Sequence, residues 1–240
     1  MKNLPILVAF LLSSIVLSAQ SFNEELKVQL DSIMTLDQAG RILLMEGQTM
    51  TNERKAELLK TINKTEEEFF GNPWGFIMTQ DEKNRASIIK ILDEYGYPGK
   101  SMVGEETSKA AWYVIQHSDP ETMGKYLPMI KEAGEQGELH QAYVVTMEDR
   151  YLMHSGKPQI YGSQTFGYTV KDAETGEDIN KLAVWPIKNP ESVNQRRKDI
   201  GFKLTVEENA RQINNLEYEV LTIEEAKALQ AKSKKFIIKK

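Results

Sequence analysis

The chain has 240 residues, of which 27% are charged and 40% hydrophobic, and it contains no cysteine. These values are close to those of ordinary globular proteins, and they exclude a disulfide-stapled scaffold, a thiol nucleophile and a thiolate metal site. The mean hydropathy of -0.46 excludes a protein that crosses a membrane many times. The net charge is -5, and binding to nucleic-acid phosphates requires a basic surface. We therefore expect no nucleic-acid partner.

The first twenty residues are typical of a cleavable export signal. Lys2 gives a positive start, an almost purely apolar run follows from Ile6 to Leu17, and small residues precede Ser21. This run is much shorter than the roughly 20 residues that a membrane-spanning helix needs. We therefore expect a signal peptide over residues 1–20, a periplasmic or secreted protein, and no stable membrane span once the signal is removed.

The next part of the chain, residues 21–156, has the pattern of a helical body. Apolar residues at helical spacing predict helices over 26–44, 51–70, 81–95, 107–117, 119–134 and 139–154. The segment over 107–117 is apolar on nearly all sides, which is typical of a central buried helix. Asp119 before Pro120 is a helix start signal, and Gly156 has the position of a helix cap.

Past Pro158 the pattern changes to that of a smaller α+β portion, residues 157–240. Alternating and β-branched residues predict strands over 159–170, 182–187 and 217–221, with a turn over 172–178. Short helices are expected from Asn189-Pro190 to Gly201, from Thr205, and from the capping box of Thr222 and Glu225. No repeat or low-complexity linker separates the two portions, so the sequence predicts one mainly helical α+β domain.

Two charged residues interrupt the core-facing stripes of the helix over 139–154. Asp149 and Arg150 both continue rows of apolar side chains. Burying one charge without a partner costs several kcal/mol, roughly, so each is expected to pair with the other or with a group elsewhere.

Polar residues continue the apolar stripes of other helices in the same way. Asp81 and Asn84 extend the stripe of the helix over 81–95, and His117 closes the helix over 107–117. If consecutive helices alternate in direction, these three side chains gather with Asp149 and Arg150 at one end of the bundle. Simple alternation places Asp37 and Arg41 at the opposite end, where an i,i+4 ion pair would explain them.

The histidines give little support to a metal site. His117 with Asp119 could form a metal pair or an acid–base couple, but a His in a last helical turn complements the helix dipole and Asp119 serves as a cap. His140 and His154 lie about 21 Å apart along one helix and cannot share an ion. Phosphate-loop, zinc-protease, calcium-loop and nucleophile-elbow motifs are absent, so we expect no metal or cofactor and interpret Ser163 as a strand hydroxyl.

A set of short motifs along the chain resembles a known family. The motifs are Asp37-Gln38 with Arg41, Tyr95-Gly96-Tyr97-Pro98 with Val103-Gly104, Ala111-Trp112 leading to Gln116-His117-Ser118-Asp119, Asp149-Arg150, Gln159-Ile160-Tyr161-Gly162-Ser163-Gln164, and Arg196-Arg197. Together they resemble the bacterial domain-of-unknown-function family 6624, from about residue 26 to 202. The resemblance implies a mixed, mainly helical domain and brings no established activity, ligand or mechanism.

The polar positions of these motifs are the candidate functional residues. Arginine suits a carboxylate or phosphate, and glutamine and tyrosine supply directional hydrogen bonds, so we expect a pocket for a polar, anionic ligand. The candidate ligand-binding residues are Arg150, Gln159, Tyr161, Gln164, Arg197, Asp81 and Asn84. This leading interpretation is an exported binding or interaction module whose partner is a small anionic ligand or a protein.

Two alternatives stay open. The first is a hydrolase-like enzyme in which His117 is the general base, Asp149 orients it, and Arg150 or Arg197 stabilises negative charge. The second is a satisfied buried network that only stabilises the fold.

Overall fold

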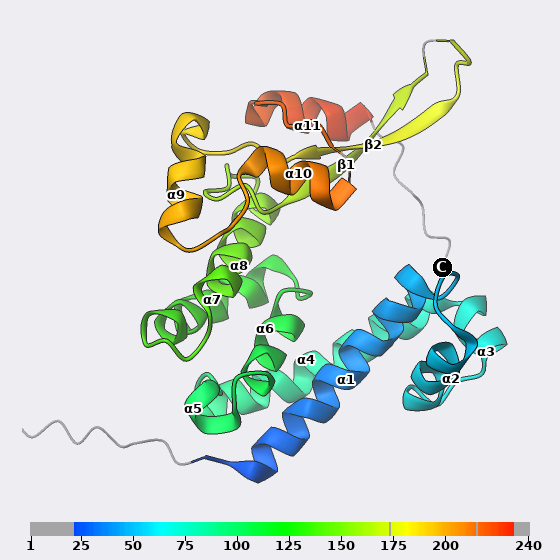
Figure 1. The fold of residues 1–240 in the computed structure, drawn as a ribbon, viewed down its shortest axis with the longest axis vertical. Helices are drawn as coiled ribbons and strands as arrows, with labels where there is room; N and C mark the ends of the chain where they lie inside the picture. The colour runs from blue at the N-terminus through cyan, green and yellow to red at the C-terminus, as the bar shows by residue number, and fades with distance from the viewer. Residues whose placement is uncertain (1–21, 173, 215, 233–240) are drawn as a thin grey trace, which may run out of the picture.

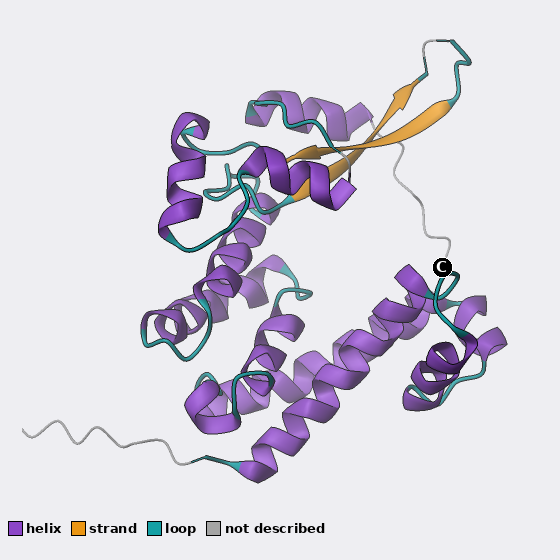
Figure 2. Cartoon of the chain, in the orientation of Figure 1, coloured by secondary structure: helices purple, strands orange, loops and turns teal. Residues whose placement is uncertain are grey.

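The computed structural model describes residues 22–172, 174–214 and 216–232 (Figure 1). The expected signal peptide lies outside these residues. Within them, none of the helices combines the length and the apolar character that crossing a membrane requires. The described part contains eleven α-helices and one two-stranded antiparallel sheet, which confirms the mainly helical α+β fold (Figure 2).

Two long antiparallel helices, α1 (Glu24–Glu46) and α4 (Pro73–Tyr95), pack along each other. Asn23 caps α1 and Asn72 caps α4, since each side chain accepts a hydrogen bond from a backbone N–H of the first turn. The α4 helix begins before residue 81, where its start was predicted, because Pro73 fits the first position of a helix.

The segment between these two helices differs from the prediction. The single helix expected over 51–70 is two helices, α2 (Asn52–Thr61) and α3 (Glu66–Gly71). Asn63 adopts a positive φ of 51°, which stops the first helix, and the capping box of Thr65 and Glu68 starts the second. Both short helices lie near the C-terminal end of α1, which is also near the start of α4 (Figure 1).

Four further helices complete the helical part of the fold. They are α5 (Lys100–Val103), α6 (Ala110–Ile115) with the preceding 3-10 helix η1 (Thr107–Lys109), α7 (Pro120–Glu135) and α8 (Gln141–His154). The α6 helix packs on α1 and α4 and is almost completely buried, which confirms its predicted central position. Asp119 caps α7 by accepting from the N–H of Thr122, and Gly156 follows α8 with a positive φ of 66°.

The C-terminal part contains a hairpin, β1 (Thr165–Lys171) and β2 (Asp178–Val184), paired from Thr165 opposite Val184 to Lys171 opposite Asp178. The remaining elements are the 3-10 helix η2 (Pro190–Ser192), α9 (Val193–Asp199), α10 (Val206–Asn214) and α11 (Ile223–Lys232). The α11 helix packs against β1, whereas the far end of the hairpin projects beyond the helices (Figure 1).

The strand prediction over 159–170 was wrong in its extent, and the one over 217–221 was wrong altogether, while the one over 182–187 overlaps β2 only in part. Residues 160–164 form a loop and not part of a strand, because the backbone N–H groups of Ile160, Tyr161, Ser163 and Gln164 donate to side chains of buried residues. Gln159 makes only an isolated parallel bridge with Ile187. Residues 217–221 alternate as a strand would but have no strand partner. Their apolar pattern is satisfied by packing instead, since Tyr218 contacts the cluster around Val206 and Leu221 contacts the cluster around Trp185.

Candidate functional site

Asp149 is fully buried near the end of α8 and holds the loop over residues 157–164 in place. Its Oδ1 accepts from the backbone N–H of Ile160 at 2.7 Å and of Tyr161 at 3.0 Å. Its Oδ2 accepts from the backbone N–H and the hydroxyl of Ser163, at 3.0 and 2.9 Å. Burial raises the pKa of Asp149, and these hydrogen bonds oppose the rise.

The loop turns at Gly162, which has a positive φ of 68°. A Cβ atom at this position would lie 2.7 Å from side-chain carbons of both Ile187 and Val206. The turn therefore requires glycine for two reasons, its backbone conformation and the space available. Ser163 precedes β1, so its hydroxyl is a partner of Asp149 and not the strand hydroxyl that was predicted.

Two buried glutamines close the loop and connect it to α8. The amide nitrogen of Gln159 donates to the backbone carbonyls of Gln164 and Trp185, and its Oε1 accepts from the N–H of Gln164. The side-chain amide of Gln164 accepts from Nε of Arg150 at 3.2 Å and donates to the Ser163 hydroxyl at 3.1 Å. These contacts make one network of the loop, Asp149 and Arg150.

Arg197 on α9 is 3% exposed and holds the other side of the loop. Its Nε donates to the carbonyl of Leu204 and its Nη1 to the carbonyl of Tyr161, both at 2.8 Å. The guanidinium lies 4.6 Å from the ring centre of Phe202. Burial lowers the pKa of Arg197, while the negative charges of Asp149 and Glu207 oppose this shift.

The remaining N–H groups of Arg197 have no such partners. Arg197 forms no ion pair with a carboxylate of the described residues. Its Nη2 donates to none of the described groups, and this atom is not completely buried, so a ligand can reach it. The side chain lines a cavity of about 310 Å³, which we call the Arg197 cavity. The other lining residues are Thr146, Ser163, Phe202, Lys203, Leu204, Asn209 and Ile213.

A second polar cluster lies between α1 and α4. Nη2 of Arg41 contacts both carboxylate oxygens of Asp81, at 2.7 and 2.8 Å, and Nη1 lies 3.3 Å from Oδ1 of Asp37. Asp37 is buried and also accepts from Asn84 at 3.4 Å and from Gln38 at 2.7 Å. Burial raises the pKa of Asp37, and the charge of Arg41 opposes this.

This arrangement corrects the prediction that Asp37 and Arg41 lie far from Asp81 and Asn84. The prediction counted one helix between α1 and α4, whereas the structure has two. The long helices are therefore antiparallel, and the later turns of α1 face the earlier turns of α4. The pair of Arg41 with Asp37 exists, but the closer contact of Arg41 is with Asp81.

His117 feels the charges of both clusters, that of Arg41 from the α1–α4 cluster and that of Arg150 from the loop network. Arg150 donates to Gln164 and, at 3.3 Å, to the carbonyl of Gln116, and it forms no ion pair with any described carboxylate. Burial, together with the charges of Arg41 and Arg150, lowers the pKa of His117 to about 3. The imidazole is therefore uncharged at neutral pH.

A model of a family of unknown function, DUF6624, matches residues 45–220. The chain belongs to this family. No curated protein and no solved structure shows significant similarity to it. In this DUF6624 protein the described residues contain no group of three or more His, Asp or Glu side chains that could hold a metal ion.

The structure brings most of the predicted site residues of this DUF6624 protein into two groups. Asp81 and Asn84 belong to the α1–α4 cluster, while the loop network contains the rest except His117, namely Asp149, Arg150, Gln159, Tyr161, Gln164 and Arg197. Tyr161 takes part through its backbone N–H and carbonyl. The five hydrogen bonds that occupy Asp149 come from four donor groups of the loop and not from His117, so the hydrolase interpretation gains no support.

Sequence reasoning missed several residues around Arg197. Phe202 and Lys203 follow the helix that ends before Gly201, and Asn209 belongs to the next helix. The only signal for them was their closeness in sequence to Arg197. Thr146, from the distant α8 helix, had no such signal because only the tertiary fold brings it to the cavity.

Proposed function

We propose that the Arg197 cavity binds a small ligand that carries a carboxylate or phosphate group. The observation that carries this proposal is that Arg197 is 3% exposed, forms no ion pair with a described carboxylate, and lines an open cavity with an Nη2 group that donates to none of the described residues. A buried charge is costly unless an opposite charge compensates it. An oxyanion would supply that charge and accept bidentate hydrogen bonds from the guanidinium.

The rest of the cavity defines the ligand further. Lys203 adds a second positive charge, and the side chain of Asn209 adds a hydrogen-bonding group. Phe202, Leu204 and Ile213 give an apolar surface. A volume of about 310 Å³ is at the lower end of the range for small-molecule sites. The ligand is therefore a compact molecule with one anionic end and a small apolar part.

The same proposal includes an exported location. The apolar run before residue 20 supports a binding module that works outside the cytoplasm. Because the chain has no cysteine, its stability there would come from the packed core and not from disulfides. The loop network then has a positioning role, because Asp149 and Gln159 fix the carbonyl of Tyr161 to which Arg197 donates.

The test is thermal unfolding in the presence of inorganic phosphate, acetate and benzoate. A ligand at about 100 times its dissociation constant stabilises the folded state by about 2.7 kcal/mol, which raises the melting temperature measurably. We expect at least one anion to do so for the wild type and for Lys198→Gln, an exposed control on the same helix.

Arg197→Lys and Lys203→Gln should lose most of this stabilisation. The first variant keeps a positive charge but lacks the planar fork, and the second removes a charge at an exposed position. Stabilisation of all four proteins to the same extent would show that the anions act elsewhere, and no stabilisation of the wild type by any of the anions would refute the proposal.

A further inference from the structure

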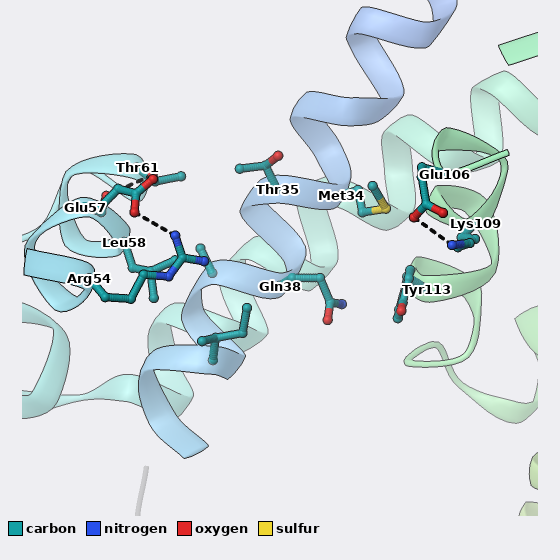
Figure 3. A pocket seen from close by; sticks show the side chains of 12 residues that line it. Met34, Thr35, Gln38, Arg54, Glu57, Leu58, Thr61, Glu106, Lys109 and Tyr113 are labelled. Carbon is teal, nitrogen blue, oxygen red and sulfur yellow. Dashed lines mark hydrogen bonds and ion pairs between the residues drawn. The ribbon is translucent and has the colours of Figure 1, made fainter. Parts of the chain in front are cut away.

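A second cavity, of about 360 Å³, lies over the outward face of α1, between α2 and the segment from η1 to α6 (Figure 3). We call it the α1 cleft. It shares no lining residue with the Arg197 cavity. Its apolar surface comes from Met34, Ala39 and Ile42 of α1, from Leu58 of α2 and from the Tyr113 ring. A ligand that fits it needs an apolar side chain of moderate size.

Gln38 places a hydrogen-bond acceptor in this cleft. Its amide nitrogen donates to Oδ2 of Asp37 at 2.7 Å. The opposite orientation of the Gln38 amide would place its oxygen against a carboxylate oxygen of Asp37. The Asp37 carboxylate therefore fixes the orientation in which the amide oxygen of Gln38 points away from it. Oε1 of Gln38 accepts from no group among the described residues and is not sealed from solvent. The cleft therefore favours a ligand with an N–H donor.

Opposite charges stand on both walls of the cleft (Figure 3). Arg54 pairs with Glu57 on α2 at 2.7 Å, and Lys109 pairs with Glu106 on the η1 side at 2.7 Å. The side chains of Arg54 and Glu57 are 50% and 66% exposed, and that of Glu106 is 81% exposed. The side chain of Lys109 is 18% exposed. Pairs with exposed members are weak, so Arg54, Glu57 and Glu106 can exchange partners with a ligand at little cost.

We propose that the α1 cleft binds a short peptide with free ends and an apolar side chain. A peptide has the three features that the cleft requires: an apolar side chain for the floor, an amide N–H for Gln38, and one charged group of each sign for the two walls. A fatty acid lacks the donor and the positive charge. A blocked peptide lacks both charged ends.

The experiment is a titration of the isotope-labelled full chain with the tripeptide Ala-Leu-Ala, followed by backbone amide NMR shifts. We expect saturable shifts at Thr35, Gln38 and Lys109. Thr35 is exposed and lines the cleft, so Thr35→Trp should fill it and weaken binding at least about tenfold. Gln29→Trp, at an exposed position of the same helix outside the cleft, should bind as the wild type does.

Three results would overturn the proposal. The first is the absence of saturable shifts up to about 10 mM peptide, and the second is equal binding by the Thr35→Trp and Gln29→Trp variants. The third is binding of octanoate, or of the N-acetylated and C-amidated tripeptide, as tight as that of the free tripeptide. The amide spectrum of each variant away from the cleft shows whether it is folded, and Gln38→Leu provides a second variant that removes the acceptor.

Discussion

The uncharged state of His117 predicts a specific loss of stability in mild acid. In the unfolded chain this imidazole titrates near its ordinary pKa of 6.5, whereas in the folded protein the pKa is about 3. Between these two values the unfolded state binds a proton that the folded state does not bind. The free energy of unfolding therefore falls as the pH falls below about 6.5, and the fall continues until the folded pKa is reached.

The magnitude follows from the difference between the two pKa values. At pH 5 the unfolded imidazole is almost fully protonated and the folded one is not, which lowers the free energy of unfolding by about 2 kcal/mol relative to pH 7.5. This figure is the same for a folded pKa of about 3 or about 4, because both lie well below pH 5.

The assay is urea unfolding at pH 7.5 and pH 5.0 for the wild type and for His117→Asn. The acid-induced loss should be about 2 kcal/mol larger for the wild type, because the variant lacks the titrating group. Asp37 and Asp149 have raised pKa values and act in the opposite direction, so the difference between the two proteins isolates His117. His140→Asn serves as the control, since His140 is an exposed cap of α8 and asparagine caps helices well.

Equal acid-induced losses in the wild type and in His117→Asn would refute this reasoning. A direct check is the NMR titration of the His117 ring protons. A midpoint between pH 6 and 7 would show that the imidazole is hydrated and free to charge in the folded protein.

Three further predictions test the loop and the helix cluster by urea unfolding. Asp149→Asn should cost about 3 kcal/mol, because an amide nitrogen would face N–H groups that now donate to a carboxylate, and a cost below about 1 kcal/mol would contradict this. Gly162→Ala should cost more than Gly176→Ala, since both glycines have positive φ but only the first has no room for a Cβ; equal costs would show that the loop yields. Arg41→Met should destabilise the protein by about 2 kcal/mol, because it leaves the Asp81 carboxylate without its partner. Adding Asp81→Asn should recover part of this loss, and a double variant whose loss equals the sum of the two single losses would disprove the coupling.

The helices were predictable because their signals are local. Asp119 before Pro120 and the glycine at position 156 start and end helices whatever the rest of the chain does, and the structure confirms both. The break at Asn63 was missed although Thr65 and Glu68 form a capping box, because the positive φ of Asn63 has no strong signal of its own and the helical pattern continues on both sides. This one missed break had a large effect, since it reversed the direction expected of α4 relative to α1.

The candidate site was predictable in composition and not in connectivity. Arg150 and Asp149 were expected to need partners, and each has them. The partners of Asp149 are mostly backbone N–H groups of a loop, and the alternating apolar pattern of that loop predicted a strand. A sequence pattern shows which side chains prefer burial, but it does not show that a distant carboxylate competes with strand pairing for the same N–H groups.

The loop network explains why Asp149 does not occupy the donors of Arg197. Asp149 raises the pKa of Arg197 through its charge, so it is close enough to favour the guanidinium. Its oxygens, however, are occupied by the loop and by the Ser163 hydroxyl, so it accepts no hydrogen bond from Arg197 or Arg150. The carboxylate thus lowers the cost of burying positive charge without using the donors that carry it. Those donors are the groups that an oxyanion would bind.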